Sequence, residues 1–158
     1  MATLPLTQSN DGNNVLRVLL VEDSDVDRDL TQYLLAILWP RCGDLEIDIA
    51  GEGREALNML HTKSYSLLLL DWQLPGMNGG RLLASLSQIG IQIPVVVLTG
   101  VERGELNVNL ENYGAVYLHK DNLRIGSLYQ SIVSAINNTL HSRPDVQPAL
   151  LQAIPPAP

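Results

Sequence analysis

The sequence of 158 residues contains a single cysteine, Cys42. One thiol cannot form a disulfide within the chain, and it cannot supply the several thiolates that a Cys-based zinc site needs. Positive charge is also scarce, because 10 Lys and Arg residues stand against 17 Asp and Glu residues, for a formal net charge of −7. Without a basic tract to neutralise phosphates, we expect no direct binding to nucleic acid or to an anionic membrane.

Long apolar runs are missing as well. No stretch approaches the roughly 20 residues that a helix needs to cross a bilayer. The first 14 residues, MATLPLTQSNDGNN, have neither a basic start nor an apolar segment, which argues against a signal peptide. Hydrophobic residues make up 46% of the chain and charged residues 17%, which is typical of a globular domain. We therefore expect an acidic cytoplasmic protein with one domain.

Both ends of the sequence have the composition of tails. Residues 1–14 are polar and include a turn-prone cluster of Asn, Asp and Gly, whereas Pro is frequent after residue 141. We expect a flexible N-terminal tail over residues 1–14 and one domain over residues 15–140. Residues 141–158 are predicted to be a Pro-rich C-terminal tail or a truncated linker.

Between the tails, short apolar runs alternate with segments of helical spacing. The runs are near-continuous in apolarity, as strands buried on both faces must be, and they cover residues 16–21, 45–49, 67–70, 95–98 and 115–118. This alternation predicts an α/β fold, a doubly wound five-stranded parallel sheet of flavodoxin or CheY-like (βα)5 type with strand order 2-1-3-4-5. Ligands of such a sheet bind beyond the carboxyl ends of its strands.

Five segments have helical spacing. The first has an apolar stripe of Val26, Leu30, Leu34, Ile37 and Leu38, and it ends before Pro40. Ser24 and Asp27 at its start resemble a capping box. The last has a stripe of Leu123, Leu128, Ile132, Ala135 and Ile136, with Asn122 as its expected N-cap. Helices are also predicted over residues 53–62, 80–88 and 103–112.

Carboxylates follow two strands that are neighbours in this strand order. Glu22 and Asp23 come directly after the first strand, and Asp71 comes directly after the third. Three converging carboxylates repel one another unless a cation lies among them, and oxygen ligands suit Mg²⁺. The acids at positions 25, 27 and 29 are explained by the positive end of the following helix dipole.

Two other strands also end in polar groups. Thr99 with Gly100 follows the fourth strand, and Lys120 follows the fifth. A hydroxyl, an ammonium, a metal and carboxylates gathered at one edge of the sheet can together hold a phosphoryl group.

Four segments of the sequence resemble the response-regulator receiver domain of the CheY-like superfamily. They are LLVED at 19–23, LLDWQLPGMNG at 69–79, PVVVLTG at 94–100 and YLHK at 117–120, and the resemblance covers about residues 15–140. Leu74 and Asn78 stand where the family commonly has Met and Asp, which keeps the turn and its glycine. Asp121 stands where the family usually has Pro, often after a cis peptide. A non-Pro cis bond costs about 2.5–4 kcal/mol, so we expect a trans or a strained bond between Lys120 and Asp121.

The resemblance implies a role for each residue at the strand ends. Asp71 aligns with the phosphoacceptor. Glu22 and Asp23 align with the acidic pair that holds Mg²⁺ together with Asp71 and the backbone carbonyl of Gln73. The three carboxylates are the groups at which the residues alone already predict a metal site, and the carbonyl of Gln73 is added by the resemblance.

The resemblance also implies the parts of a switch. Thr99 and Lys120 align with the hydroxyl and the ammonium that contact the phosphoryl group, and Tyr117 aligns with the aromatic residue that turns inward when the threonine moves. Gln73 and Val101 align with the positions that set the lifetime of the phosphorylated state. Val101 is apolar and branched, so a long-lived state is expected.

The implied function is a phosphorylation-dependent switch of a two-component system or phosphorelay. A sensor histidine kinase or a histidine phosphotransfer domain would supply the phosphoryl group, and the domain would be no enzyme beyond its own phosphoryl transfer and autodephosphorylation. Output would pass through a homodimer or an effector docked on the fourth helix, fifth strand and fifth helix. In this chain that face would draw on Leu106, Val108, Leu110, Tyr113 and Tyr129.

Two other functions fit these residues less well. A phosphohydrolase with an Asp nucleophile would want a second acid two residues after Asp71, where Gln73 stands. A flavodoxin-like FMN carrier would need a phosphate-binding loop after the first strand, and the acidic residues there would repel the phosphate.

Overall fold

The computed structural model describes residues 15–40, 44–142 and 155–158. Five parallel strands form one sheet in the order β2-β1-β3-β4-β5, as the sequence predicts. The strands are β1 (Leu16–Val21), β2 (Leu45–Ala50), β3 (Leu67–Leu70), β4 (Val95–Thr99) and β5 (Val116–His119). The helices are α1 (Asp25–Leu38), α2 (Gly53–Thr62), α3 (Gly79–Gln88) and α4 (Ile125–Ser142). Three short 3-10 helices are η1 (Arg103–Glu105), η2 (Leu110–Tyr113) and η3 (Lys120–Asn122).

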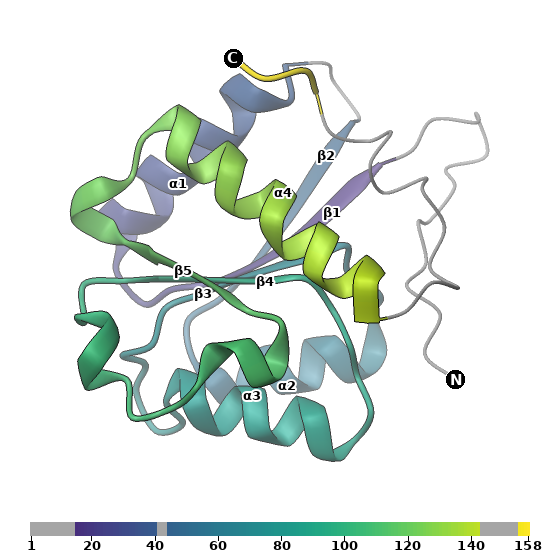
Figure 1. Ribbon diagram of the computed structural model, residues 1–158, viewed down its shortest axis with the longest axis vertical. Coiled ribbons are helices and arrows are strands. Elements are labelled where there is room, and N and C mark those ends of the chain that lie inside the picture. The colour runs from purple at the N-terminus through teal and green to yellow at the C-terminus, as the bar shows by residue number, and fades with distance from the viewer. Residues whose placement is uncertain (1–14, 41–43, 143–154) are drawn as a thin grey trace.

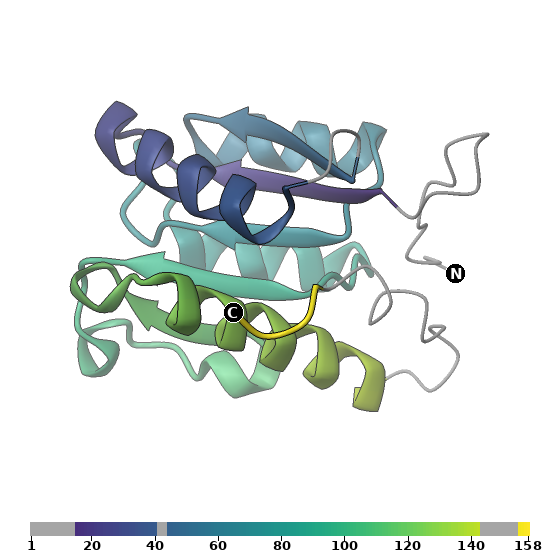
Figure 2. The same ribbon diagram turned by 90° about the horizontal axis from the view of Figure 1, so that it is seen from above.

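The sheet lies between two layers of helices, with α1 and α4 on one face and α2 and α3 on the other (Figures 1 and 2). The four leucines of β3 show why its sequence is apolar throughout. Leu67 and Leu69 pack into the core under α1 and α4, whereas Leu68 and Leu70 pack into the core under α2 and α3. A strand covered on both faces leaves no position for a polar side chain until it ends.

The predicted apolar stripe of α1 is wrong in part. Val26 is 77% exposed, Leu30 45% and Ile37 42%, so three of its five members face away from the sheet. The sheet-facing side is formed by Leu34, Leu35 and Leu38 with Thr31. Apolar residues cover a wide arc of this helix, and spacing alone does not choose between the overlapping stripes within that arc.

The predicted α-helix over residues 103–112 is also wrong. The segment forms η1 and η2, separated by Asn107, whose φ of 56° lies in the left-handed region and interrupts helical geometry. Asn109 then caps η2 by accepting a hydrogen bond from the amide of Glu111 at 3.0 Å. Residues 103–113, all of which the structure describes, therefore do not form the fourth helix of the predicted docking face. Two residues assigned to that face, Leu106 and Leu110, are buried.

The last helix begins later than predicted. The stripe from Leu123 to Ile136 is buried as expected, but Asn122 belongs to η3 and is not the N-cap, because α4 begins at Ile125. The helix runs to Ser142, past the predicted domain end at 140. Tyr129, which lies on this helix, donates a hydrogen bond from its hydroxyl to the carbonyl of Pro155 at 2.9 Å.

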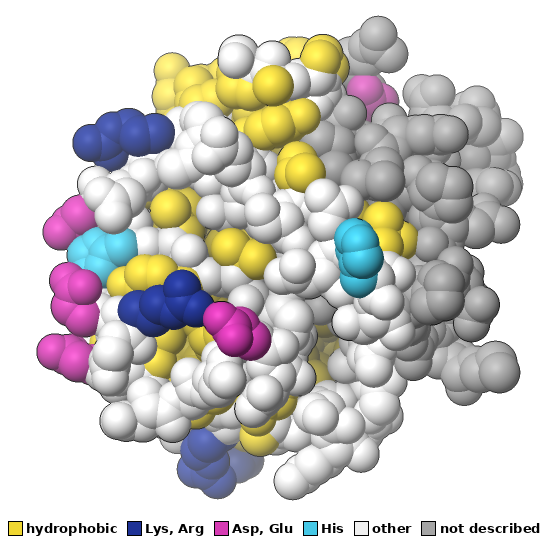
Figure 3. All heavy atoms as spheres, viewed as in Figure 1, with side chains coloured by type: hydrophobic (Ala, Val, Ile, Leu, Met, Phe, Trp, Pro, Cys, Tyr) yellow, Lys and Arg dark blue, Asp and Glu magenta, His cyan; other side chains and the backbone are white. Residues whose placement is uncertain are grey.

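The predicted N-terminal tail, Cys42 and most of the predicted C-terminal tail lie outside the described residues. Within the part that the structure describes, no helix has both the length and the apolarity needed to cross a bilayer. Described Lys and Arg side chains are few and scattered on the face shown in Figure 3.

Candidate functional site

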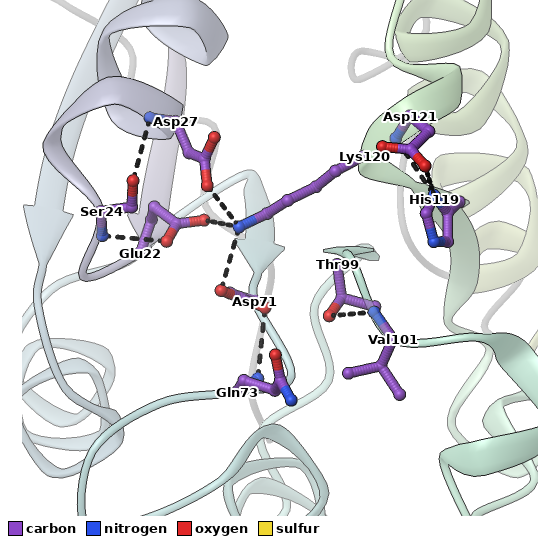
Figure 4. Close-up of polar contacts among 10 residues, drawn as sticks. All are labelled: Glu22, Ser24, Asp27, Asp71, Gln73, Thr99, Val101, His119, Lys120 and Asp121. Carbon is purple, nitrogen blue, oxygen red and sulfur yellow. Dashed lines mark hydrogen bonds and ion pairs between the residues drawn. The ribbon is translucent and has the colours of Figure 1, made fainter.

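The predicted site residues meet at the carboxyl edge of the sheet. Glu22 follows β1, Asp71 follows β3, Thr99 ends β4, and Lys120 follows β5. Figure 4 shows Lys120 reaching across this edge toward Glu22 and Asp71. Parallel strands bring these residues together although they are far apart in the sequence.

The acidic trio is Glu22, Asp23 and Asp71, each of which offers one carboxylate oxygen within 4.8 Å of the others. Glu22 is 3% exposed and Asp71 6% exposed, whereas Asp23 is open to solvent. Burial raises the pKa of Glu22, and hydrogen bonds from Lys120 and from the amide of Ser24 oppose that shift. An oxygen-only set of crowded carboxylates, open on one side for water, fits Mg²⁺.

Lys120 is the cation of this site. Its Nζ lies 2.7 Å from Glu22 Oε2, 3.1 Å from Asp71 Oδ2 and 2.8 Å from Asp27 Oδ2. Burial disfavours the charge of the ammonium, but hydrogen bonds to these three carboxylates outweigh burial and raise the pKa of Lys120. One ammonium nevertheless stands against four carboxylates, counting Asp23, so the site retains excess negative charge for a divalent ion.

Asp27 is the site residue that sequence reasoning missed. The sequence predicts only a role at the helix start for Asp27, and its amide does donate to the capping Ser24 Oγ at 3.3 Å. The other half of the predicted capping box is wrong, because the carboxylate of Asp27 turns to Lys120 and the amide of Ser24 donates to Glu22 Oε1 at 3.0 Å. The only signal in the sequence was the density of acids after the first strand.

The loop after Asp71 is held by its backbone. The amide of Gln73 donates to Asp71 Oδ1 at 3.2 Å, and the side chain of Gln73 is exposed. The amide of Gly79 donates to the carbonyl of Trp72 at 3.0 Å. Asn78 caps α3 by accepting from the amide of Arg81 at 2.9 Å, so Asn in place of the usual Asp keeps this cap.

Two hydrogen bonds link Thr99, Val101 and Tyr117. Figure 4 shows Thr99 and Val101 on the side of Asp71 away from Asp27. Thr99 is fully buried, and its Oγ1 accepts from the amide of Val101 at 3.3 Å. The hydroxyl of Tyr117 donates to the carbonyl of Val101 at 2.7 Å. Thr99 and Tyr117 are therefore connected through the backbone of one residue.

The backbone after Lys120 contains no cis bond, which holds for every described peptide. His119 caps η3 here, because its Nδ1 accepts from the amide of Asp121 at 3.1 Å, while its Nε2 lies 3.2 Å from the carbonyl of Gly100. The histidine that caps η3 thus contacts Asp121, at the position where the family usually has Pro.

Comparison with known proteins decides the family. The family model of the response regulator receiver domain matches residues 18–133, which is most of the chain. The chain belongs to this family. The receiver is 32% identical over 99 residues to the sensor histidine kinase RcsC of Salmonella typhimurium, a match that covers 62% of this chain but 10% of the kinase. The shared part is thus a small fraction of that relative.

Solved receiver structures share the fold. The signal receiver domain of a putative LuxO repressor protein from Vibrio parahaemolyticus has a TM-score of 0.67 at 27% identity, over 84% of this chain and 99% of that one. The receiver domain of the sensor histidine kinase PA1611 from Pseudomonas aeruginosa PAO1 has a TM-score of 0.66 at 21% identity, over 78% of this chain and 98% of that one. That structure has a magnesium ion coordinated in its active site cleft.

Proposed function

We propose that this receiver is a phosphorylation switch of a two-component system or phosphorelay, with Asp71 as the phosphoacceptor. The observation that carries the proposal is the setting of Asp71, a buried carboxylate that shares an oxygen cluster with Glu22 and Asp23 and lies 3.1 Å from Lys120 Nζ. A carboxylate oxygen of Asp71 attacks the phosphorus of a phosphohistidine, and the bond from phosphorus to the imidazole nitrogen breaks. The leaving imidazole takes up a proton.

Each neighbour has a distinct task in that transfer. Glu22, Asp23, Asp71 and the carbonyl of Gln73 would hold Mg²⁺, which supplies charge that offsets the phosphoryl oxygens. The ammonium of Lys120 supplies further positive charge. The hydroxyl of Thr99 donates to a phosphoryl oxygen once the group is in place.

The partners and limits of this switch follow from the same chemistry. A sensor histidine kinase or a histidine phosphotransfer domain donates the phosphoryl group, in the cytoplasm where such donors are charged by ATP. The domain, which extends at least from residue 15 to the end of α4 at Ser142, catalyses only its own phosphorylation and dephosphorylation. Output through a homodimer or a docked effector uses β5 and α4 with η2, in place of the predicted fourth helix.

Phosphorylation by a small donor tests this function. We expect incubation with acetyl phosphate and Mg²⁺ to add one phosphoryl group to the intact protein, because no partner is needed when the receiver itself supplies the catalytic groups. Chelating the metal with EDTA is expected to suppress the added mass, since the acidic trio then repels the anionic donor. Equal incorporation with and without the metal would contradict a metal-dependent acceptor.

We expect Thr99 and Tyr117 to move together on activation. A ligand shifts a two-state element only through contacts that differ between its states, and Thr99 gains a phosphoryl contact only in the active state. Its movement disturbs Val101, whose carbonyl holds the Tyr117 hydroxyl in the structure described here. Structures with and without Mg²⁺ and beryllofluoride test this coupling. Thr99 and Tyr117 side chains that stay in place on binding would argue against it.

The lifetime of the phosphorylated state is expected to depend on Val101. Its apolar branched side chain offers no group that could orient a water molecule for attack on the acyl phosphate, and Gln73 offers only an amide. We expect Val101→Glu to speed phosphoryl loss by about tenfold or more, because positioned acid–base groups contribute about 10²–10⁴-fold to proton transfer. Val108→Glu, on the same β4–β5 connection, is the control. Radiolabel decay that is no faster in Val101→Glu than in this control would exclude Val101 as the gate.

A further inference from the structure

Asp27 is not used by any role proposed above, yet it contacts the centre of the site. Its Oδ2 lies 2.8 Å from Lys120 Nζ, and the two side chains are 38% and 20% exposed. The contact joins the first turn of α1 to the segment after β5, which lie 93 residues apart in the sequence. Asp27 is outside the acidic trio that gathers within metal-binding distance.

Neighbouring acids on α1 do not share this contact. Asp25 forms an ion pair with Arg28 along the helix. Asp29 is exposed, so it represents an acid that only favours the helix start. The cap at Ser24 fixes the first turn so that position 27 faces Lys120 (Figure 4).

The ammonium of Lys120 has three N–H groups and three carboxylate partners. Glu22, Asp27 and Asp71 accept at 2.7, 2.8 and 3.1 Å, which leaves no N–H for a phosphoryl oxygen. A phosphoryl group on Asp71 can therefore contact Lys120 only if one acceptor gives way. Glu22 and Asp71 have a second use for their oxygens, as metal ligands, whereas Asp27 has none.

We propose that Asp27 is a positioning residue that holds the ammonium of Lys120 in the unphosphorylated receiver and competes with the phosphoryl group for it. The proposal rests on the function proposed for Asp71. Asp27 keeps Lys120 beside the acceptor, and it also reduces the positive charge available to the phosphoryl oxygens. The phosphorylated state is therefore less stable with Asp27 in place than it would be without Asp27.

The binding of beryllofluoride, a phosphoryl mimic, measures this competition without turnover. At saturating Mg²⁺, we expect Asp27→Asn to bind beryllofluoride about three- to tenfold more tightly than the wild type, the size expected for removing one charge near a partly exposed ion pair. Asp29→Asn makes the same charge change on the same helix and is expected to bind within about twofold of the wild type. Tryptophan fluorescence can report binding, because Trp72 adjoins Asp71.

A second background separates competition for Lys120 from general repulsion. In a Lys120→Met background, the effect of Asp27→Asn is expected to disappear, since no ammonium remains to compete for. Circular dichroism melting establishes that each variant is folded.

The proposal is overturned if Asp27→Asn binds beryllofluoride no more tightly than the wild type, or if Asp29→Asn matches its gain. A gain that persists undiminished in the Lys120→Met background also overturns it. Failure of the proposed function has a different signature, in which Asp71→Asn binds beryllofluoride as the wild type does.

Discussion

Replacing Asp71 with Asn is expected to abolish phosphorylation by acetyl phosphate in the presence of Mg²⁺. The amide keeps the shape of the carboxylate but has no anionic oxygen to attack phosphorus. It also removes one of the three carboxylates that gather to hold the metal. Glu22, the other buried carboxylate of the trio, already accepts from Lys120 and from the amide of Ser24.

Intact mass spectrometry checks this prediction, with Asp29→Asn as the matched control that keeps the site unchanged. We expect the control to gain one phosphoryl group as the wild type does and Asp71→Asn to gain none. A phosphoryl gain by Asp71→Asn equal to that of the control would show that the acceptor is another residue.

Gly79→Ala is expected to lower the free energy of unfolding by about 1–3 kcal/mol, the usual cost of overpacking a close contact. A Cβ on Gly79 would lie 2.8 Å from Trp72 Cε3, 3.0 Å from Trp72 Cα and 3.2 Å from the carbonyl oxygen of Asp71. Two of these atoms are backbone, so a side-chain rotation cannot relieve the contact. The residues that must shift are the phosphoacceptor and its neighbour, so phosphorylation is expected to slow as well.

Gly126→Ala is the matched control for that variant. Gly126 also lies at the start of a helix, and an added Cβ there meets nothing within 4 Å. Because Ala is a better helix former than Gly, we expect this control to be unchanged or up to about 1 kcal/mol more stable. Urea denaturation compares the three proteins. Equal stability of Gly79→Ala and the wild type would contradict the close packing of α3 against Trp72.

The sheet could be predicted because most of its strands are short runs of apolar residues. A strand buried on both faces has to be apolar throughout, and the first polar residue then marks the edge of the sheet, as Asp71 does after the four leucines of β3. The same rule located Glu22 and Thr99, whereas Lys120 follows His119, the polar last residue of the partly buried β5. The family pattern supplied the expected roles of all these residues. Their meeting at one edge follows from parallel strand order.

The helices were harder to predict, for two physical reasons. On α1, apolar residues surround so much of the helix that the buried side depends on how the helix packs, and Val26 and Ile37 ended outside. Between β4 and β5, Leu106 and Leu110 have helical spacing but are buried by two 3-10 turns, since Asn107 adopts a left-handed conformation. Local spacing carries no information on either outcome.

Asp27 shows why a site is harder to predict than a fold. Acids at a helix start are common, and the one local signal at Asp27, its spacing from Ser24, predicts a capping box and not a contact with Lys120. Its contact with Lys120 depends on the turn taken after β5, where Asp121 replaces the usual Pro and His119 caps η3. Only the assembled edge of the sheet brings these two segments together.

Identifying the phosphorylated residue by chemical trapping is the most direct test of Asp71 as the phosphoacceptor. Borohydride reduces an aspartyl phosphate to homoserine, so treatment of the phosphorylated receiver followed by peptide mass mapping identifies the acceptor. We predict homoserine at position 71 alone, formed only when the phosphodonor and Mg²⁺ were both present. Homoserine at another aspartate, or an acid-stable phosphoester on Thr99, would contradict the assignment of Asp71 as the phosphoacceptor.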